Sequence, residues 1–335
     1  MKKKNNEKKG IIILFVATIV VLYMSLKDNF KEVVIGFTKL NPFWILISII
    51  FVFGYYYFKS LSLYCLARKF KSDINFFKIL KIVLITQFFD GVTPSATGGQ
   101  PYQIYAFNKE KIDVIDSTNI AIQNFIVYQI ALILLGLLAV ISNSYLNLFS
   151  SVGSIRNLII LGFIINVVVV ISLFSLAFMK KINKKIIILG VNLLSKLKII
   201  KNKSEVIKNT NSYIEQFHKG ALTLLSNKGD FVKTIVYNFV GLVLIYVVPS
   251  IIIFGLGLYQ DINVFYSIIA SAYVMLIGAF VPIPGGTGGL EYAFVKFYGV
   301  FVGGSTLMLV MLLWRFLTYY LGVIVGSFLL NIRKK

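Results

Sequence analysis

Long apolar runs alternate with short basic segments along this chain. Runs of about 20 apolar residues are long enough to cross a lipid bilayer as helices. The pattern predicts six full transmembrane helices, at residues 11–26, 43–66, 118–141, 157–179, 235–257 and 305–330. The first run is short and follows a lysine-rich start, as a signal peptide would. No small-residue cleavage site follows Leu26, so we expect a membrane anchor there.

Two further apolar segments resemble one another. At one fixed offset, six residues of the first segment match six residues of the second: Asp73, Ile74, Asn75, Phe77, Pro94 and Gly98 correspond to Asp261, Ile262, Asn263, Phe265, Pro282 and Gly286. Paired apolar segments that are interrupted by Gly and Pro in two halves of a membrane protein indicate a binding site built from broken helices.

Each paired segment breaks where a spanning helix would continue. Residues 74–89 carry Lys78 and Lys81 and then meet Gly91 and Pro94. Proline removes a backbone donor and clashes with the preceding turn, and glycine loosens the helix. Because the open carbonyls of a broken helix cannot face lipid, we predict re-entrant helical hairpins at 74–112 and 262–302. Each would consist of a half-helix, a Gly/Pro tip and a returning half-helix.

Composition supports a membrane protein and excludes a nucleic-acid partner. Apolar residues make up 58% of the chain and the mean hydropathy is +0.83, outside the range of soluble domains. Most of the 34 Lys and Arg residues behind the net charge of +21 lie in five short stretches: 1–10, 67–81, 102–117, 180–234 and 331–335. All five face the cytoplasm if the spans alternate from an inside N-terminus, so the positive-inside rule accounts for the basicity.

This topology predicts an all-α polytopic protein of the cytoplasmic membrane, with both termini in the cytoplasm. The first hairpin would enter from the cytoplasm and the second from outside. Residues 11–141 and 157–330 then form an inverted-topology repeat, the plan of transporters that work by alternating access as one repeat rocks against the other. Residues 1–10 and 331–335 would be basic tails. Residues 180–234, which interrupt the second repeat, would be a basic amphipathic helical linker on the membrane surface.

The two tips supply the candidate binding residues. The N-termini of returning half-helices present unpaired amides and a partial positive charge, which suit an anionic group such as a lipid phosphate. Tight turns needed only for folding are the alternative. The candidate substrate-binding residues are Asp90, Thr93, Pro94, Thr97, Gly98, Gly99, Gln100, Pro282, Pro284, Gly285, Gly286, Gly288, Gly289, Glu291 and Arg315.

Arg315 lies about 15 Å of helical rise into the last predicted span. A charge at that depth costs about 2.5–3.5 kcal/mol on insertion scales, so we expect an anionic partner: Glu291, Asp90 or the ligand phosphate. A purely structural Arg315–Glu291 pair is the alternative. Asp90 is expected to cap a helix or to couple protons. Lys59 and Lys296 are expected near the interfaces, where their stems can snorkel.

The sequence gives no support for a metal site, a cofactor site or a Ser-His-Asp catalytic triad. Cys65 is the single cysteine and His218 the single histidine, which excludes an internal disulfide, a cysteine metal site and a Ser-His-Asp arrangement. Asp90 and Glu291 are the candidate carboxylates for an intramembrane enzyme.

Both tips resemble the signatures of the lysylphosphatidylglycerol synthase transmembrane-region family. The resemblance rests on two motifs, Thr93-Pro94-Ser95-Ala96-Thr97-Gly98-Gly99-Gln100-Pro101 and Pro282-Ile283-Pro284-Gly285-Gly286-Thr287-Gly288-Gly289-Leu290-Glu291, and extends over residues 11–330. That family includes stand-alone flippase-like proteins and the membrane half of the multiple peptide resistance factor. The resemblance implies a bacterial or archaeal membrane protein that moves lipids such as aminoacylated phosphatidylglycerol between leaflets, with a role in antibiotic resistance.

We therefore expect a lipid flippase or transporter whose partners are anionic phospholipid headgroups. The alternatives are the membrane part of a phosphatidylglycerol lysyltransferase, another lipid-modifying enzyme, or a scaffold for a separate one; a homo-oligomer is also open. In the resistance factor a soluble domain performs the lysyl transfer. Residues 180–234 are too short for such a domain and Lys335 follows the last span directly, so we expect no lysyltransferase activity.

Overall fold

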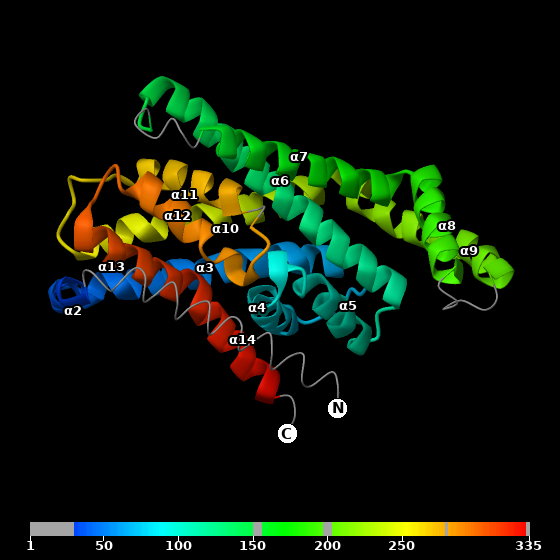
Figure 1. The fold of residues 1–335 in the computed structure, drawn as a ribbon. Coiled ribbons are helices and arrows are strands. Elements are labelled where there is room, and N and C mark those ends of the chain that lie inside the picture. The colour runs from blue at the N-terminus through cyan, green and yellow to red at the C-terminus, as the bar shows by residue number, and fades with distance from the viewer. Residues whose placement is uncertain (1–29, 150–155, 197–202, 279–280, 333–335) are drawn as a thin grey trace.

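Helices form all the regular structure in the part of the chain that the computed structural model describes, residues 30–149, 156–196, 203–278 and 281–332 (Figure 1). The predicted all-α class is confirmed. In these residues five helices are long and apolar enough to cross a membrane: α3 (Pro42–Ala67), α6 (Val114–Leu146), α7 (Arg156–Phe178), α10 (Lys228–Gly255) and the continuous stretch Gly304–Asn331. They match five of the six predicted spans. The sixth, 11–26, lies outside the described residues.

Local capping explains where several of these helices begin. Asn41 precedes α3 and accepts a hydrogen bond from the Phe43 N–H at 3.0 Å, with Pro42 in the first helical turn. Asp113 caps α6 through the Ile115 N–H at 2.9 Å. Asn227 caps α10 in the same way. The short helix α2 (Phe30–Lys39) precedes α3.

Both paired segments are interrupted helices, as their Gly and Pro residues predict. The first consists of α4 (Phe76–Val92), the 3₁₀ turn η1 (Pro94–Ala96) and α5 (Gly99–Lys109). The second consists of α11 (Val264–Gly278), the turn η3 (Pro284–Gly286) and α12 (Gly289–Tyr298). In each segment the two helices pack against one another, and the two turns η1 and η3 also contact each other.

The last span contains a π-helical turn. Helix α13 (Gly304–Arg315) continues through η4 (Phe316–Tyr320) into α14 (Leu321–Ile332). Helix α14 packs on α4, where Gly326 lies so close to the Leu84 carbonyl that an added Cβ would collide with it. Small residues at such crossings let helix backbones approach closely.

Helices from the two halves of the chain alternate in the packed core. Helix α3 packs along α10, α14 along α4, and α11 against α6 and α7. The largest fully buried side chains come from both halves, among them Tyr56, Phe107, Phe294 and Tyr298. This arrangement places the two turns, η1 and η3, next to one another (Figure 1).

The predicted linker is helical and packs against the bundle. Helices α8 (Lys180–Lys196) and α9 (Lys203–Ser226) contact each other, and α9 also packs on α6 and α7. The Gln123 amide donates to the Gly220 carbonyl at 2.9 Å, and Lys69 donates to the Thr223 carbonyl at 3.1 Å. These contacts fix α9 on the bundle at one end of the molecule (Figure 1).

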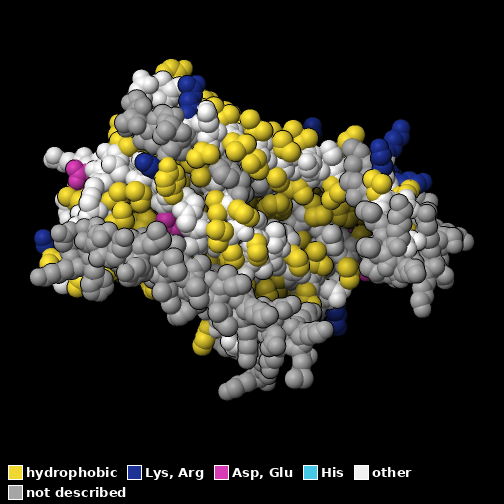
Figure 2. Space-filling model, in the orientation of Figure 1, with side chains coloured by type: hydrophobic (Ala, Val, Ile, Leu, Met, Phe, Trp, Pro, Cys, Tyr) yellow, Lys and Arg dark blue, Asp and Glu magenta, His cyan; other side chains and the backbone are white. Residues whose placement is uncertain are grey.

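Apolar side chains cover much of the visible outer surface. Figure 2 shows them across the middle of one face, with Lys and Arg gathered at its right-hand end, over α8. On α7 the exposed residues include Ile160, Leu161, Ile164, Val168 and Ile171. Monomeric soluble proteins rarely expose contiguous apolar patches on this scale, so this surface fits contact with lipid.

Candidate functional site

A central cavity of about 540 Å³ lies where the two turns meet. Its wall is built from α3, α4, α5, α6, α7, α10, α11 and α12, together with η1, η3 and the residues around η4. A volume in this range suits a small molecule or a lipid headgroup. In the part of the chain that the structure describes, no three His, Cys, Asp or Glu side chains gather to hold a metal ion.

A buried ion pair organises the second turn. Arg315 Nε donates to Glu291 Oε1 at 2.5 Å, and the two side chains are only 5% and 9% exposed. Arg315 Nη2 also donates to the Gly285 carbonyl at 2.9 Å, and Glu291 Oε2 accepts the Gly288 N–H at 2.7 Å. Of the anionic partners expected for Arg315, Glu291 is the one that its guanidinium group contacts. Because Arg315 also lines the cavity, the pair connects the backbone of this turn to the cavity wall.

Tyr319 links the end of helix α4 to the second turn, and nothing in the sequence singled it out. Its hydroxyl donates to the Gly91 carbonyl at 2.9 Å, and its ring lies 4.8 Å from the Arg315 guanidinium carbon. Gly285 has a φ of +65°, and a Cβ there would collide with the Tyr319 ring. Only glycine fits both the backbone angle and the space. No local pattern distinguishes Tyr319 from the neighbouring Tyr320, so only the fold could have found it.

At the first turn, Thr93 holds the backbone in place. Its hydroxyl donates to the Phe89 carbonyl at 2.7 Å and accepts the Gly98 N–H at 2.8 Å. Gly99 lies against Asp90, so an added Cβ would collide with the Asp90 carboxylate. Asp90 itself lines the cavity, and its buried Oδ1 atom has no hydrogen-bond partner among the described residues.

Lys59 corrects an expectation. The sequence placed it near an interface, whereas the structure places it on the cavity wall. Its ammonium group lies 3.3 Å from Gln87 Oε1 and 3.4 Å from the Tyr55 hydroxyl, and 5.4 Å from the centre of the Tyr128 ring. Packing of α3 on α4 turns this lysine inward, and its position within a long apolar run was the available signal.

The predicted site residues separate into two groups. Those on the cavity wall are Asp90, Thr97, Gln100, Gly285, Gly286 and Arg315. Those that shape the turns behind it are Thr93, Pro94, Gly98, Gly99, Pro282, Pro284, Gly288, Gly289 and Glu291. Amide side chains complete the wall: Gln103, which the sequence already suggested as a neutral hydrogen-bonding group suited to a headgroup, and Asn124, Gln129 and Asn166, which were missed. Polar residues inside the apolar runs 118–141 and 157–179 could have indicated the last three.

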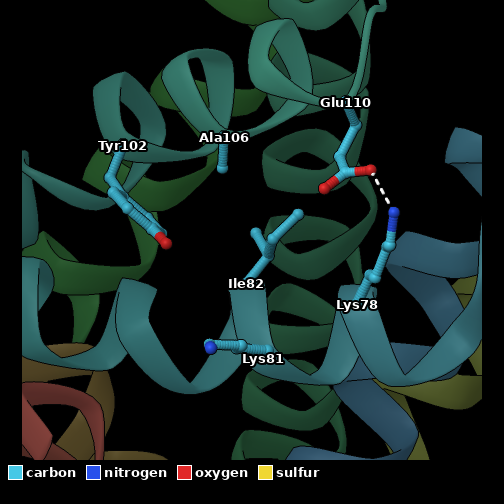
Figure 3. A pocket seen from close by; sticks show the side chains of 6 residues that line it. All are labelled: Lys78, Lys81, Ile82, Tyr102, Ala106 and Glu110. Carbon is cyan, nitrogen blue, oxygen red and sulfur yellow. Dashed lines mark hydrogen bonds and ion pairs between the residues drawn. The ribbon is translucent and has the colours of Figure 1, made fainter. Parts of the chain in front are cut away.

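A smaller cavity of about 210 Å³ lies between α4 and α5. Figure 3 shows the residues around it: Lys78, Lys81 and Ile82 come from α4, Tyr102 and Ala106 come from α5, and Glu110 directly follows α5. Lys78 Nζ and Glu110 Oε2 are 2.6 Å apart. This ion pair joins the two helices at the ends that lie away from their turn.

Broken, paired helices around a central cavity inside an apolar bundle define a polytopic membrane protein. The chain belongs to the lysylphosphatidylglycerol synthase TM region family, whose model matches residues 10–326. It is also 24% identical over 303 residues to a UPF0104 membrane protein of Archaeoglobus fulgidus, with 86% of each chain covered. The resemblance expected from the two turn motifs is therefore confirmed.

Proposed function

We propose that this protein translocates an anionic phospholipid between the leaflets of the cytoplasmic membrane, with the headgroup held in the central cavity. The observation that carries this proposal is the cavity itself. It lies between two broken helices inside an apolar bundle, polar side chains are set into its largely apolar wall, and two cations, Lys59 and Arg315, line it. Charged groups inside membrane proteins typically mark the path of a substrate.

The contact pattern supports an inverted repeat with two re-entrant hairpins. The pairing of α4 with α14 has its counterpart in the pairing of α11 with α6, and the two turns contact each other. We propose that the first hairpin enters from the cytoplasm and the second from outside, with six full spans and both termini in the cytoplasm. The basic composition of 67–81, 102–117 and 180–234 supports this orientation.

Translocation is tested by leaflet exchange in proteoliposomes. A labelled anionic phospholipid should exchange between leaflets faster with the wild-type protein than in empty liposomes. Lys59→Gln should slow exchange several-fold, because it removes a cation from the cavity wall. Lys296→Gln is the matched control, since Lys296 is exposed and lies 5.7 Å from the Tyr292 ring centre, away from the cavity. Exchange at the rate of empty liposomes would overturn the proposal.

A second candidate function comes from the family name: part of, or a scaffold for, a lipid-modifying enzyme such as a lysylphosphatidylglycerol synthase. Acid–base chemistry needs two positioned groups. Glu291 is held by Arg315 and by the Gly288 N–H, which leaves Asp90 as the carboxylate on the described cavity wall. A lipid inventory of a deletion strain separates the two functions: loss of a lipid species supports synthesis, whereas unchanged totals with altered surface exposure support translocation.

A further inference from the structure

The smaller cavity, between α4 and α5, is separate from the site of the proposed function. It shares no lining residue with the central cavity. Its volume of about 210 Å³ lies below the roughly 300–1,000 Å³ typical of pockets for whole drug-sized ligands, so it suits a single small group. The polar side chains on its wall decide which group fits: Lys78, Lys81, Tyr102 and Glu110.

The charges on this wall do not balance. Two lysines, Lys78 and Lys81, stand against one carboxylate, Glu110, which leaves a net charge of +1. Lys78 and Glu110 pair with each other at 2.6 Å. Lys81 is half-buried and makes no hydrogen bond or ion pair with any residue that the structure describes. A partly buried charge without a partner carries a desolvation cost, which an anionic ligand would offset.

The donors on the wall are grouped. The Tyr102 hydroxyl lies with the Lys81 ammonium group on one side of the cavity, and the Lys78–Glu110 pair lies on the other (Figure 3). Tyr102 is 5% exposed, and its ring stacks on Phe89 with centroids 4.7 Å apart, which fixes its position. Lysine binds phosphate as a point charge, and a tyrosine hydroxyl adds a further donor. This side of the cavity therefore offers donors and positive charge to one anion.

The surroundings of the cavity are apolar. Phe77 lies four residues before Lys81 and is 74% exposed, and Tyr105 lies three residues after Tyr102 and is 53% exposed. Residues with these spacings share one face of a helix. Lys81 is about 7.5 Å of helical rise from the start of α4, which under the proposed topology lies at the cytoplasmic surface. An anion bound here would thus lie beside exposed aromatic rings, at the depth where a lipid headgroup meets its chains.

We propose that this cavity is a second binding site, for the phosphate group of a phosphate ester, with Lys81 and Tyr102 as its donors. A phospholipid of the surrounding leaflet and a free phosphate ester share this chemistry. The exposed rings of Phe77 and Tyr105 favour the lipid, because they add apolar contact for its chains. A bound phosphate would join α4 to α5 at a distance from their turn. The site requires no passage of lipid through the central cavity.

Native mass spectrometry of the purified full-length protein tests this inference, because it counts bound ligands and gives an affinity for each. The probes are dihexanoyl phosphatidate and glycerol 3-phosphate, which carry the same phosphate group with and without chains. Lys81→Gln should weaken binding at one site about tenfold, since a hydrogen bond to a charged group accounts for about that ratio. Tighter binding of phosphatidate assigns the site to a lipid; equal Lys81-dependent binding of both probes assigns it to a free phosphate ester.

Lys109→Gln is the matched control. It removes the same charge from an exposed position on α5 whose ammonium group lies 4.8 Å from the centre of the Tyr105 ring and does not line the cavity. Its affinity for both probes should stay close to that of the wild type. Equal losses in Lys109→Gln and Lys81→Gln would overturn the inference, because they would indicate attraction to surface charge alone.

Tyr102→Phe provides a second test that keeps both the charge of Lys81 and the ring stacked on Phe89. It should weaken the same binding step several-fold. Lys59→Gln, on the wall of the central cavity, should leave that step unchanged and so separates the two sites. Unchanged affinity in both Lys81→Gln and Tyr102→Phe would overturn the inference. Lys81-dependent binding by a protein that exchanges no lipid would overturn translocation and leave this second site standing.

Discussion

The buried Arg315–Glu291 pair gives the most quantitative prediction about this molecule. Glu291→Gln keeps the shape of the side chain and removes its charge, which leaves the buried Arg315 guanidinium with neutral acceptors in the second turn, among them the Gly285 carbonyl. Breaking one partner of a buried pair costs about 3–5 kcal/mol. Because the Gly285 carbonyl still accepts a hydrogen bond from Arg315, we expect a loss near the lower end, about 3 kcal/mol.

A double-mutant cycle measures this effect. The free energy of unfolding is compared in mixed micelles for the wild type, Glu291→Gln, Arg315→Met and the double variant. If the two side chains interact as the structure shows, the double variant should lose about 2 kcal/mol less than the sum of the single losses, because it buries no unpaired charge.

Two results would refute this reasoning: single losses that add, or a Glu291→Gln variant as stable as the wild type. The Lys78–Glu110 pair is the internal control. The Lys78 side chain is 57% exposed, and exposed pairs contribute about 0–1 kcal/mol, so Lys78→Gln should change stability by less than about 1 kcal/mol.

Two glycine substitutions test the remaining geometry. Gly285→Ala should lower stability by about 1–3 kcal/mol and slow lipid exchange, because the new Cβ meets the Tyr319 ring at a positive φ. Gly303→Ala, with a φ of −128° and open space around the added Cβ, should be close to neutral in the same thermal assay. Gly326→Ala should separate α14 from α4 by forcing the Leu84 carbonyl away, which would lower the unfolding temperature. An unchanged unfolding temperature for Gly326→Ala would contradict the close crossing described above.

Much of the fold could be predicted because it follows from local chemistry. Apolar runs locate the spans, and Pro94, Pro282 and their neighbouring glycines break the two paired segments wherever the rest of the chain packs. The depth of Arg315 also follows from its position in a run. The partner of Arg315 could not be predicted in the same way, because the sequence left both Glu291 and Asp90 as candidates. Only the packing of α12 on α13 selects Glu291.

The cavity wall was harder to predict, because it is assembled across space. Lys59 looks like a snorkelling lysine when α3 is considered alone, and becomes a cavity residue only when α4 packs beside it. Asn124 and Asn166 come from different helices, and nothing in the spacing of either run places them around one void. The side chains of the two turns were recognised from their motif, although many of them shape the backbone and do not line the cavity.

Helix α14, from the second half of the chain, crosses α4 from the first half, and α3 from the first half packs along α10 from the second. The two halves therefore contact each other at two separate places. A swing of one entire half would have to open the Gly326 crossing and the contacts between α3 and α10 at the same time. Each turn is held by a short set of contacts: the hydrogen bonds of Tyr319, Thr93 and Arg315, and at the second turn the buried Arg315–Glu291 pair. Under the proposed function, displacing these two short turns would uncover the central cavity without opening either crossing, first toward one side of the membrane and then toward the other.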